Sequence, residues 1–348
     1  MKIKYVNIIA LALLLVATSC GDKLKFYGNT YDAAYPKYVD TLKGSVLDLE
    51  SEFTGAISAY DGMLFSISEK QPDGCIYLYD ASTGKRINAI CQTGNGPNEV
   101  IRVSFYHCFE RDSSKISMWV NDYNKNNLML VDTQGKYVKT IETSKLNVNN
   151  PYPMMRVFVL NDSLLIAYVQ AMELMSKVVS PSYRVINYKT GDIVKEYKFY
   201  SDYKVSTDTG IPPAAYLVSY EALKPDKTKI AMVMRHLGRV NIFDIKAGKI
   251  KSIKTKDAPD LNLISSGISM KQSYKGVCCD DHYIYAIEAA SDLSNGTINI
   301  FDWNGNFTHI LQVNKDAIHF ALDPIRKVLY TKNDFEEVVA YNLKFLYE

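Results

Sequence analysis

The chain has 348 residues, with 40 basic and 38 acidic side chains and a formal net charge of +2 at pH 7. This balance, without any basic run, argues against nucleic acid as a partner. The length would allow two domains, but β-rich folds of this size often form one.

The N-terminus predicts export. Lys2 and Lys4 precede the apolar run "VNIIALALLLVATSC", which is too short and too abruptly ended for a transmembrane helix and is typical of a secretory signal peptide. Small residues directly before Cys20 resemble the lipobox of bacterial lipoproteins. That resemblance implies cleavage before Cys20, acylation of its thiol and durable anchoring, because each buried CH₂ contributes about 0.8 kcal/mol.

We therefore expect residues 1–19 to be a signal peptide, residues 20–37 a lipidated tether and residues 38–348 the folded domain. An ordinary secreted protein is the alternative. Cleavage would remove two lysines and leave 38 basic and 38 acidic side chains. No later segment is apolar enough to span a membrane.

A repeat runs through the folded part. Six segments alternate apolar and polar residues up to an Asp or Asn, and five of them continue through a short Gly-containing turn into a second alternating run. Asx side chains and glycines are typical of hairpin turns. The anchors are spaced 52, 55, 57, 58 and 40 residues apart: Asp80, Asp132, Asn187, Asp244, Asp302 and Asn342.

A further alternating run, entered through a polar turn, precedes each hairpin. These runs are residues 60–68, 112–120, 161–169, 225–234, 280–288 and 323–331. One more strand per unit gives about four strands, and such units repeated roughly every fifty residues indicate a β-propeller. We expect an all-β, six-bladed β-propeller of four-stranded antiparallel blades. A sandwich or barrel is the competing architecture.

The last repeat is the shortest and lacks a terminal strand. Residues 38–49, "YVDTLKGSVLDL", alternate like a strand without a hairpin partner. We expect this N-terminal strand to complete the sixth blade and close the ring, which would remove exposed sheet edges.

The loop "CQTGNGPNEV" has two glycines one residue apart, as nucleotide-binding loops do. A dinucleotide fingerprint would need a third small residue where Glu99 stands and a helix afterwards, but "VIRVSFYHCF" alternates like a strand. No Walker-type lysine follows either. We therefore interpret Gly94, Gly96 and Pro97 as a loop connecting two blades and expect no nucleotide.

The "GNGPNE" loop, the recurring hairpins and the lipobox together resemble the TolB-like six-bladed β-propeller lipoproteins of Bacteroidetes. The resemblance covers residues 38–348 and implies the fold and an envelope location, on either face of the outer membrane. It implies neither an activity nor a cofactor, and later blades lack a strong copy of the glycine loop.

Candidate ligand contacts are charged residues in loops near the expected channel mouth. Glu99 and Arg102 flank the glycine loop, and Arg235 and His236 occupy the turn in "MVMRHLGRV". They would suit an anion or a sugar, whereas the alternative is a solvated turn with internal ion pairs.

Metal and nucleophile signatures are weak. The histidines, at 107, 236, 282, 309 and 319, lack the spacing of a compact metal site, although separate blades could still assemble ligands. No serine or cysteine lies in a hydrolase motif. Five cysteines follow the signal, so at least one stays unpaired within the chain, and whether any disulfide forms is open: Cys75, Cys91, Cys108, Cys278 and Cys279.

We thus expect a membrane-anchored binding or scaffold module for an envelope protein or a glycan. The alternative is a lyase or glycan hydrolase that uses the central channel. Carboxylates and histidines converging at one channel mouth would favour the enzyme, and a neutral channel with an exposed aromatic face would favour binding.

Overall fold

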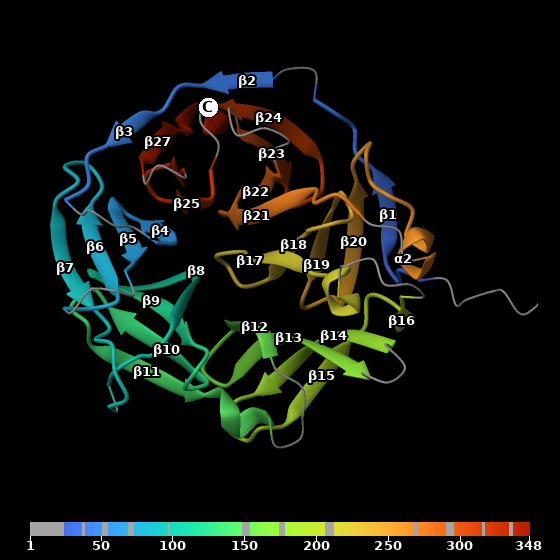
Figure 1. The fold of residues 1–348 in the computed structure, drawn as a ribbon, viewed down its shortest axis with the longest axis horizontal. Helices are drawn as coiled ribbons and strands as arrows, with labels where there is room; N and C mark the ends of the chain where they lie inside the picture. The colour runs from blue at the N-terminus through green and yellow to red at the C-terminus, as the bar shows by residue number, and fades with distance from the viewer. Residues whose placement is uncertain are drawn as a thin grey trace, which may run out of the picture.

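Six small sheets surround a common axis in the computed structural model (Figure 1). The structure describes residues 24–36, 39–50, 55–68, 73–96, 98–147, 154–173, 178–205, 212–266, 270–289, 296–314, 317–333 and 337–348. The prediction of an all-β, six-bladed propeller is confirmed. We number the blades 1 to 6 in chain order.

Each blade runs from an inner strand at the axis to an outer strand at the rim. The inner strands are β4 (Ile57–Tyr60), β8 (Val103–Asp112), β12 (Met154–Val159), β17 (Ser219–Leu223), β21 (Tyr274–Cys279) and β25 (His319–Asp323). The second strands are β5 (Met63–Ile67), β9 (Lys115–Asp122), β13 (Leu164–Glu173), β18 (Lys229–Met234), β22 (Tyr283–Glu288) and β26 (Val328–Lys332).

The third strands are β6 (Ile76–Asp80), β10 (Asn127–Asp132), β14 (Val178–Asn187), β19 (Arg239–Asp244), β23 (Gly296–Asp302) and β27 (Val338–Asn342). The outer strands of blades 1 to 5 are β7 (Arg86–Ile90), β11 (Tyr137–Glu142), β15 (Ile193–Tyr197), β20 (Lys249–Lys254) and β24 (Phe307–Val313), and β16 (Tyr203–Lys204) also pairs with β14. Helical turns are short: η1 (Thr143–Asn147), η2 (Pro213–Ala215), α2 (Asn262–Ser266) and η3 (Lys344–Tyr347).

Five of the six predicted anchors form the turns of the outer hairpins, whereas Asn342 precedes η3. The Oδ1 atom of Asp80 accepts hydrogen bonds from the backbone N–H groups of Ser82 and Thr83, both at 2.9 Å. The side chains at the other five positions likewise accept backbone N–H groups two to four residues ahead: Asp132, Asn187, Asp244, Asp302 and Asn342. The local sequence therefore dictates a turn held by an Asp or Asn side chain in each of the five outer hairpins.

The start of the described chain forms a strap around half of the rim. β1 (Asn29–Asp32) pairs in parallel with β20, and β2 (Val39–Leu42) pairs in parallel with β24. β3 (Ser45–Leu47) then pairs antiparallel with β27, so an N-terminal strand completes blade 6 as predicted. Most of the range expected to be a tether, residues 20–37, is therefore bound to the propeller from Leu24 onward, whereas Tyr38 lies outside the described residues.

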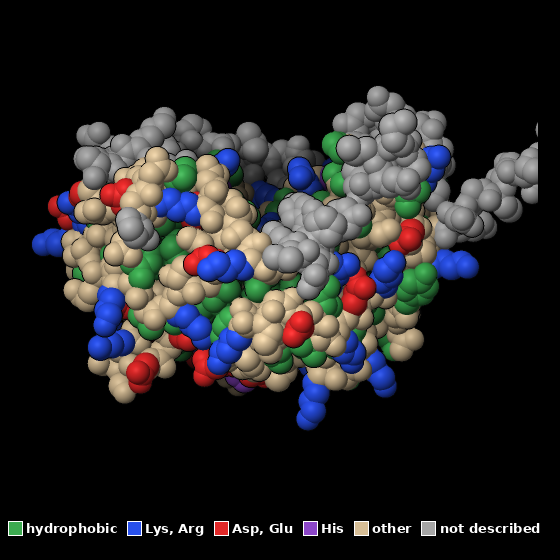
Figure 2. All heavy atoms as spheres, turned by 90° about the horizontal axis from the view of Figure 1, so that it is seen from below, with side chains coloured by type: hydrophobic (Ala, Val, Ile, Leu, Met, Phe, Trp, Pro, Cys, Tyr) green, Lys and Arg blue, Asp and Glu red, His purple; other side chains and the backbone are tan. Residues whose placement is uncertain are grey.

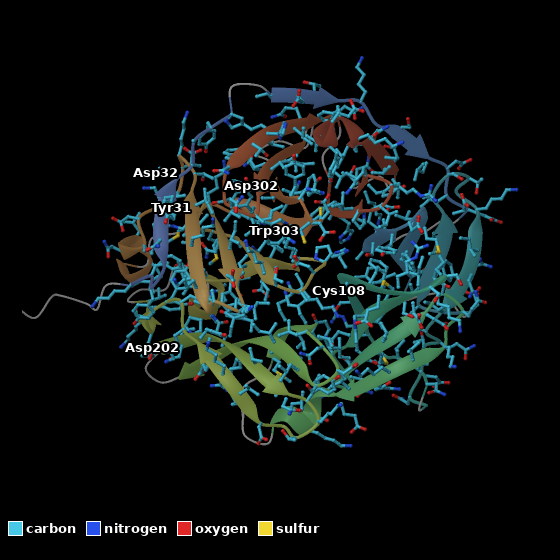
Figure 3. The ribbon with its side chains drawn as sticks, turned by 180° about the vertical axis from the view of Figure 1, so that it is seen from behind. Tyr31, Asp32, Cys108, Asp202, Asp302 and Trp303 are labelled. Atoms are coloured by element: carbon cyan, nitrogen blue, oxygen red, sulfur yellow. The ribbon has the colours of Figure 1, made fainter. Side chains whose placement is uncertain are left out.

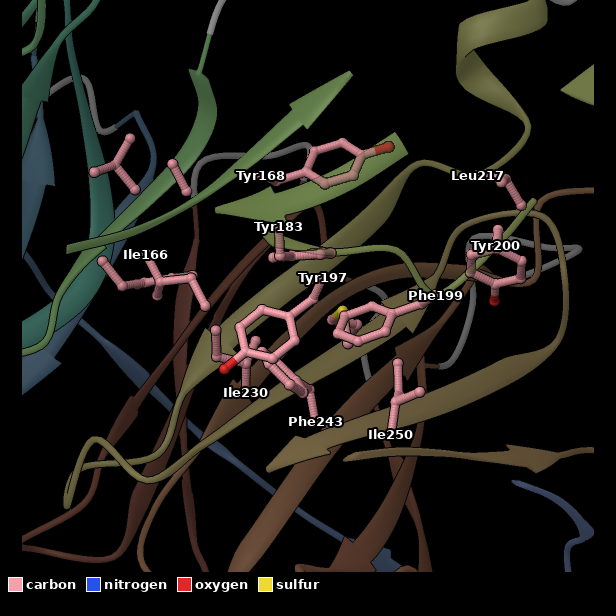
Figure 4. Close-up of a cluster of buried hydrophobic side chains, with 14 of the residues drawn as sticks. Ile166, Tyr168, Tyr183, Tyr197, Phe199, Tyr200, Leu217, Ile230, Phe243 and Ile250 are labelled. Carbon is pink, nitrogen blue, oxygen red and sulfur yellow. The ribbon is translucent and has the colours of Figure 1, made fainter. Parts of the chain in front are cut away.

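Aromatic side chains fill the interface between blades 3 and 4 (Figure 4). Phe243 of β19 is fully buried, and its ring centroid lies 4.7 Å from that of Phe199 and 4.9 Å from that of Tyr197. Leu24, at the start of the strap, belongs to the same cluster. On the visible rim, basic and acidic side chains are interspersed, in keeping with the balanced composition (Figure 2).

Candidate axial site

The connections between strands emerge on two faces. Loops that lead from one blade to the next, and loops between second and third strands, share what we call the upper face. The glycine loop between β7 and β8 and the turn at residues 235–238 between β18 and β19 both belong to this face. The candidate residues are therefore on the face where we expected a channel mouth.

One polar side chain from every inner strand lies along the axis. We call this set the axial ring: Ser58, His107, Arg156, Glu221, Lys275 and His319. All but Ser58 line a chamber of about 160 Å³, together with apolar residues such as Phe105 and Val277. Figure 3 labels Cys108, the neighbour of His107, close to the centre of the propeller.

Bulges in three inner strands present ring members to the channel. In β8, Phe105 pairs with Val120 and Phe109 with Met118, so three residues of β8 oppose one of β9. The register also shifts before Arg156 in β12 and around Lys275 in β21. Such bulges re-aim side chains and are frequent beside functional sites.

His107 lies within the β8 bulge in the left-handed region, with φ of 53°. A non-glycine residue held there costs about 1–3 kcal/mol, so the surrounding structure must impose the conformation. The Nδ1 atom lies 2.9 Å from the Oγ atom of the buried Ser58. Water reaches the imidazole within the channel, but the surrounding protein lowers its pKa to about 4, by desolvation first and then by the charges of Arg156 and His319.

Glu221 is the acidic member of the ring. Its Oε1 atom accepts hydrogen bonds from the Tyr183 hydroxyl at 2.6 Å and the Ser219 hydroxyl at 2.8 Å. Its Oε2 atom is buried and has no hydrogen-bond partner among the described residues. Burial raises the pKa of Glu221, and the charge of Arg156 and the two hydroxyl donors oppose that rise.

A groove on the upper face continues outward from the chamber. It has a volume of about 610 Å³ and shares Phe105 and His107 with the chamber. Arg102, Tyr123 and Asn124 also line it, and the Tyr123 side chain is 40% exposed. The chamber and the groove therefore form a continuous path from the rim loops of blade 2 to the axis.

A second cavity, of about 240 Å³, lies on the other side of His107. The side chains of Cys108, Phe109 and Cys279 line it, and burial raises the pKa of both thiols. All five cysteines of the described residues are free thiols. Cys108, Cys278 and Cys279 lie in inner strands, whereas Cys75 and Cys91 are buried just outside β6 and β7.

Of the residues predicted from sequence, Glu99 is used inside its own loop. Its carboxylate accepts the backbone N–H of Gly96 at 2.7 Å, and a Cβ atom added to Gly94 would lie 2.0 Å from that carboxylate. Gly94 adopts a φ of 157°, and Lys125 donates to the carbonyl oxygens of Gly96 and Glu99 at 2.8 and 2.6 Å. The glycines therefore make room for an internal carboxylate, and Pro97 lies outside the described residues.

The other three candidate residues do not lie together. Arg102 lines the groove beside His107. His236 is buried and lines a different pocket of about 370 Å³ between blades 4 and 5, where burial and then the charge of Arg235 lower its pKa. The backbone carbonyl oxygen of Arg235 accepts a hydrogen bond from the N–H of Ser273 at 2.7 Å. Neither Arg235 nor His236 lines the axial chamber.

The axial ring is not evident from the repeat, because the repeated pattern marks the second strands and the hairpins and leaves the inner strands unassigned. One signal was present. His107, Arg156, Glu221 and Lys275 each stand five residues before the Asp or Asn that opens the next turn.

No group of three potential metal ligands gathers anywhere in the described parts of the chain. Cys20, the predicted lipidation site, lies outside them. Among the helices that the structure describes, none has the length and apolar character needed to cross a membrane.

Neither a family model nor a curated protein matches the chain. Two crystal structures are similar in fold. A protein from Bacteroides fragilis, described as a "putative exported protein", is 14% identical with a TM-score of 0.52 over 87% of this chain and 99% of that chain. A member of the DUF4221 family from Bacteroides vulgatus is 11% identical with a TM-score of 0.51 over 92% of this chain and 98% of that chain. At these identities the likeness supports the fold alone, and membership of the TolB-like family stays a prediction.

Proposed function

We propose that the protein is an exported propeller that binds an acidic glycan, with the charged end group of the glycan in the axial chamber. The observation that carries this proposal is the axial ring. Five strands from five different blades each supply one polar side chain to a small chamber on the axis, and Ser58 of blade 1 lies within hydrogen-bond distance of His107. A scaffold without a ligand would gain nothing from placing charges there, because burying a charge is costly.

The charges of the ring favour an anion. Arg156 and Lys275 are cationic, whereas Glu221 is the one acidic residue that lines the chamber among the described residues. An arginine can bind a carboxylate through two parallel hydrogen bonds, and such pairs are strong where water is excluded. His107, with a pKa of about 4, is neutral at pH 7 and can exchange hydrogen bonds with a hydroxyl group.

The dimensions favour a chain of sugars over a single small ion. The chamber of 160 Å³ has room for about five water molecules at ~30 Å³ each, which suits one charged end group. The adjoining groove is larger and offers the exposed ring of Tyr123 with the polar Asn124 and Arg102. Aromatic faces beside hydrogen-bonding side chains are suited to amphipathic ligands.

We propose further that the protein acts at the cell envelope as a lipoprotein anchored through Cys20, on the outer membrane of a Gram-negative cell. The sequence before Cys20 supports the anchor, and the name of the Bacteroides fragilis protein supports export. A propeller held at the membrane with its upper face accessible would suit the capture of envelope or extracellular glycans.

The test is calorimetric titration of the full mature domain with oligouronides and with neutral oligosaccharides of the same length. We expect saturable binding of the acidic series and at least tenfold weaker binding of the neutral one. Arg156→Met and Lys275→Met should each weaken binding at least tenfold, whereas Arg326→Met, which removes a lower-face arginine paired with Asp61, should not. Equal affinity for both series would contradict the proposal.

A second candidate function is elimination on a uronic acid in the same chamber. The observation that favours it is His107, a neutral imidazole next to Arg156 and His319. His107 could take the proton alpha to the carboxylate held by Arg156, and a carbon–carbon double bond would form as the glycosidic oxygen at the next carbon leaves and accepts that proton from His107. Ultraviolet absorbance of the unsaturated product on oligouronides tests this, and binding without any absorbance change would exclude it.

A further inference from the structure

We propose that the propeller stands on its edge at the membrane, with the start of the strap and the rim of blade 3 against the lipid headgroups. This inference rests on the proposed acylation of Cys20. It concerns an interaction surface on the rim rather than the axial site.

The chain between Cys20 and Leu24 is short. Four residue steps separate Cys20 from Leu24, and even a fully extended chain covers about 14 Å over that stretch at ~3.6 Å per residue. Leu24 is only 4% exposed, because it is buried in the core cluster of blades 3 and 4. The lipid anchor therefore holds this part of the rim close to the membrane surface.

The attachment continues through hydrogen bonds to blade 3. The backbone N–H of Lys25 donates to the Ser201 hydroxyl at 3.0 Å, and that of Ser201 donates to the Lys25 carbonyl at 2.9 Å. The N–H of Tyr27 donates to the carbonyl of Phe199 at 2.8 Å. The chain leaving the anchor is thus fixed to the blade from its second described residue and cannot swing the propeller away.

The exposed side chains at this point suit a lipid interface. Tyr27 is 60% and Tyr31 53% exposed. The outer strands β7, β11 and β15 expose aliphatic side chains instead, and the other exposed aromatic residues that the structure describes, Tyr123 and Phe345, lie in a turn of blade 2 and in η3. Tyrosine is enriched at membrane interfaces because one end of its ring is apolar and the other is wet.

The charges around these tyrosines favour an anionic surface modestly. Lys25, Lys198, Lys204 and Lys254 surround them, against Asp32 and Asp202, which pair with Lys254 at 2.9 Å and with Lys198 at 3.4 Å. Figure 3 shows Tyr31, Asp32 and Asp202 on the same side of the ring. Lysines near a membrane surface attract anionic headgroups. In this orientation neither face of the propeller is pressed against the bilayer, so the upper groove stays open.

The test places a tryptophan at three positions of the acylated full chain, reconstituted in phosphatidylcholine and phosphatidylglycerol vesicles that carry brominated acyl chains. Tyr31→Trp reports the proposed edge. Ile87→Trp is a matched control, because Ile87 is 54% exposed on β7, which lies across the ring from β1 (Figure 1). Tyr123→Trp reports the upper face. The native Trp119 and Trp303 are 3% and 6% exposed and contribute the same background to all three proteins.

We expect the added fluorescence of Tyr31→Trp to be quenched at least twofold more than that of Ile87→Trp or Tyr123→Trp. Equal quenching at all three positions, or strongest quenching at position 123, would overturn the edge-on orientation alone. A chain that does not float with the vesicles would overturn the anchor and the orientation together. Oligouronide binding by the Cys20→Ser chain in solution tests the glycan proposal separately.

Discussion

The outer hairpins and the inner strands of the same six blades follow different rules. Every outer hairpin turns on an Asp or Asn whose side chain accepts backbone N–H groups. The inner strands differ from one another, and three of them carry register shifts beside axial-ring residues. The difference indicates that the repeated part of the sequence builds the fold. The part that varies between blades supplies the side chains that line the channel.

The largest effect should come from the packed outer part of a blade. Phe243→Ala removes a fully buried ring that contacts Phe199 and Tyr197, and truncation of a buried Phe costs about 3–5 kcal/mol. We expect guanidinium unfolding to show a loss of this size, while the protein that remains folded keeps its oligouronide affinity. Arg156→Met should show the reverse pattern. A large loss of affinity with Phe243→Ala would break the proposed division between fold and site.

An intermediate effect should follow from a turn anchor. In Asp302→Ala, the backbone N–H groups of Asn304 and Asn306 lose hydrogen bonds of 2.9 and 2.8 Å, at a cost of about 1 kcal/mol. Figure 3 labels Asp302 beside its chain neighbour Trp303. Asp302→Asn should be nearly neutral, because asparagine holds the corresponding hairpin turn at position 187. Equal losses in both variants would show that charge, not turn geometry, matters there.

The smallest effect should be a change in pH dependence. His107 has a pKa of about 4 in the folded protein against 6.5 ordinarily, so between these values the unfolded chain binds a proton that the folded chain does not. Stability should therefore fall as the pH drops from about 6.5 towards 4. His107→Asn should flatten that part of the profile, measured by chemical unfolding at several pH values. A slope unchanged by the substitution would contradict the assignment of this pH dependence to His107.

The fold could be predicted because its signals are local. Asp80 and Gly84 carry the turn chemistry within a few residues, so repetition of that pattern identified six blades and a closing strand. β1 was missed, and β2, which falls within the strand expected at residues 38–49, pairs in parallel with β24 of blade 5 instead of completing blade 6. An isolated strand that joins an outer edge in parallel has no hairpin of its own to signal where it pairs.

The site was harder, because its geometry depends on pairing between strands. His107 reaches the axis through a bulge defined by β8 against β9, and nothing in "VSFYHCFERD" alone marks that shift. Glu99 was a candidate ligand contact, but its carboxylate accepts the backbone N–H of Gly96 within the loop. The usable signal was the distance along the sequence to the next turn. Arg156 stands five residues before Asn161, and Glu221 stands five residues before Asp226.

The most direct measurement is a crystal structure of the protein soaked with glucuronate, compared with crystals soaked with glucose. The account predicts density for glucuronate in the axial chamber, with its carboxylate between Arg156 and Lys275, and none for glucose at the same concentration. Glucuronate density only outside the channel, or equal density for both sugars, would contradict it.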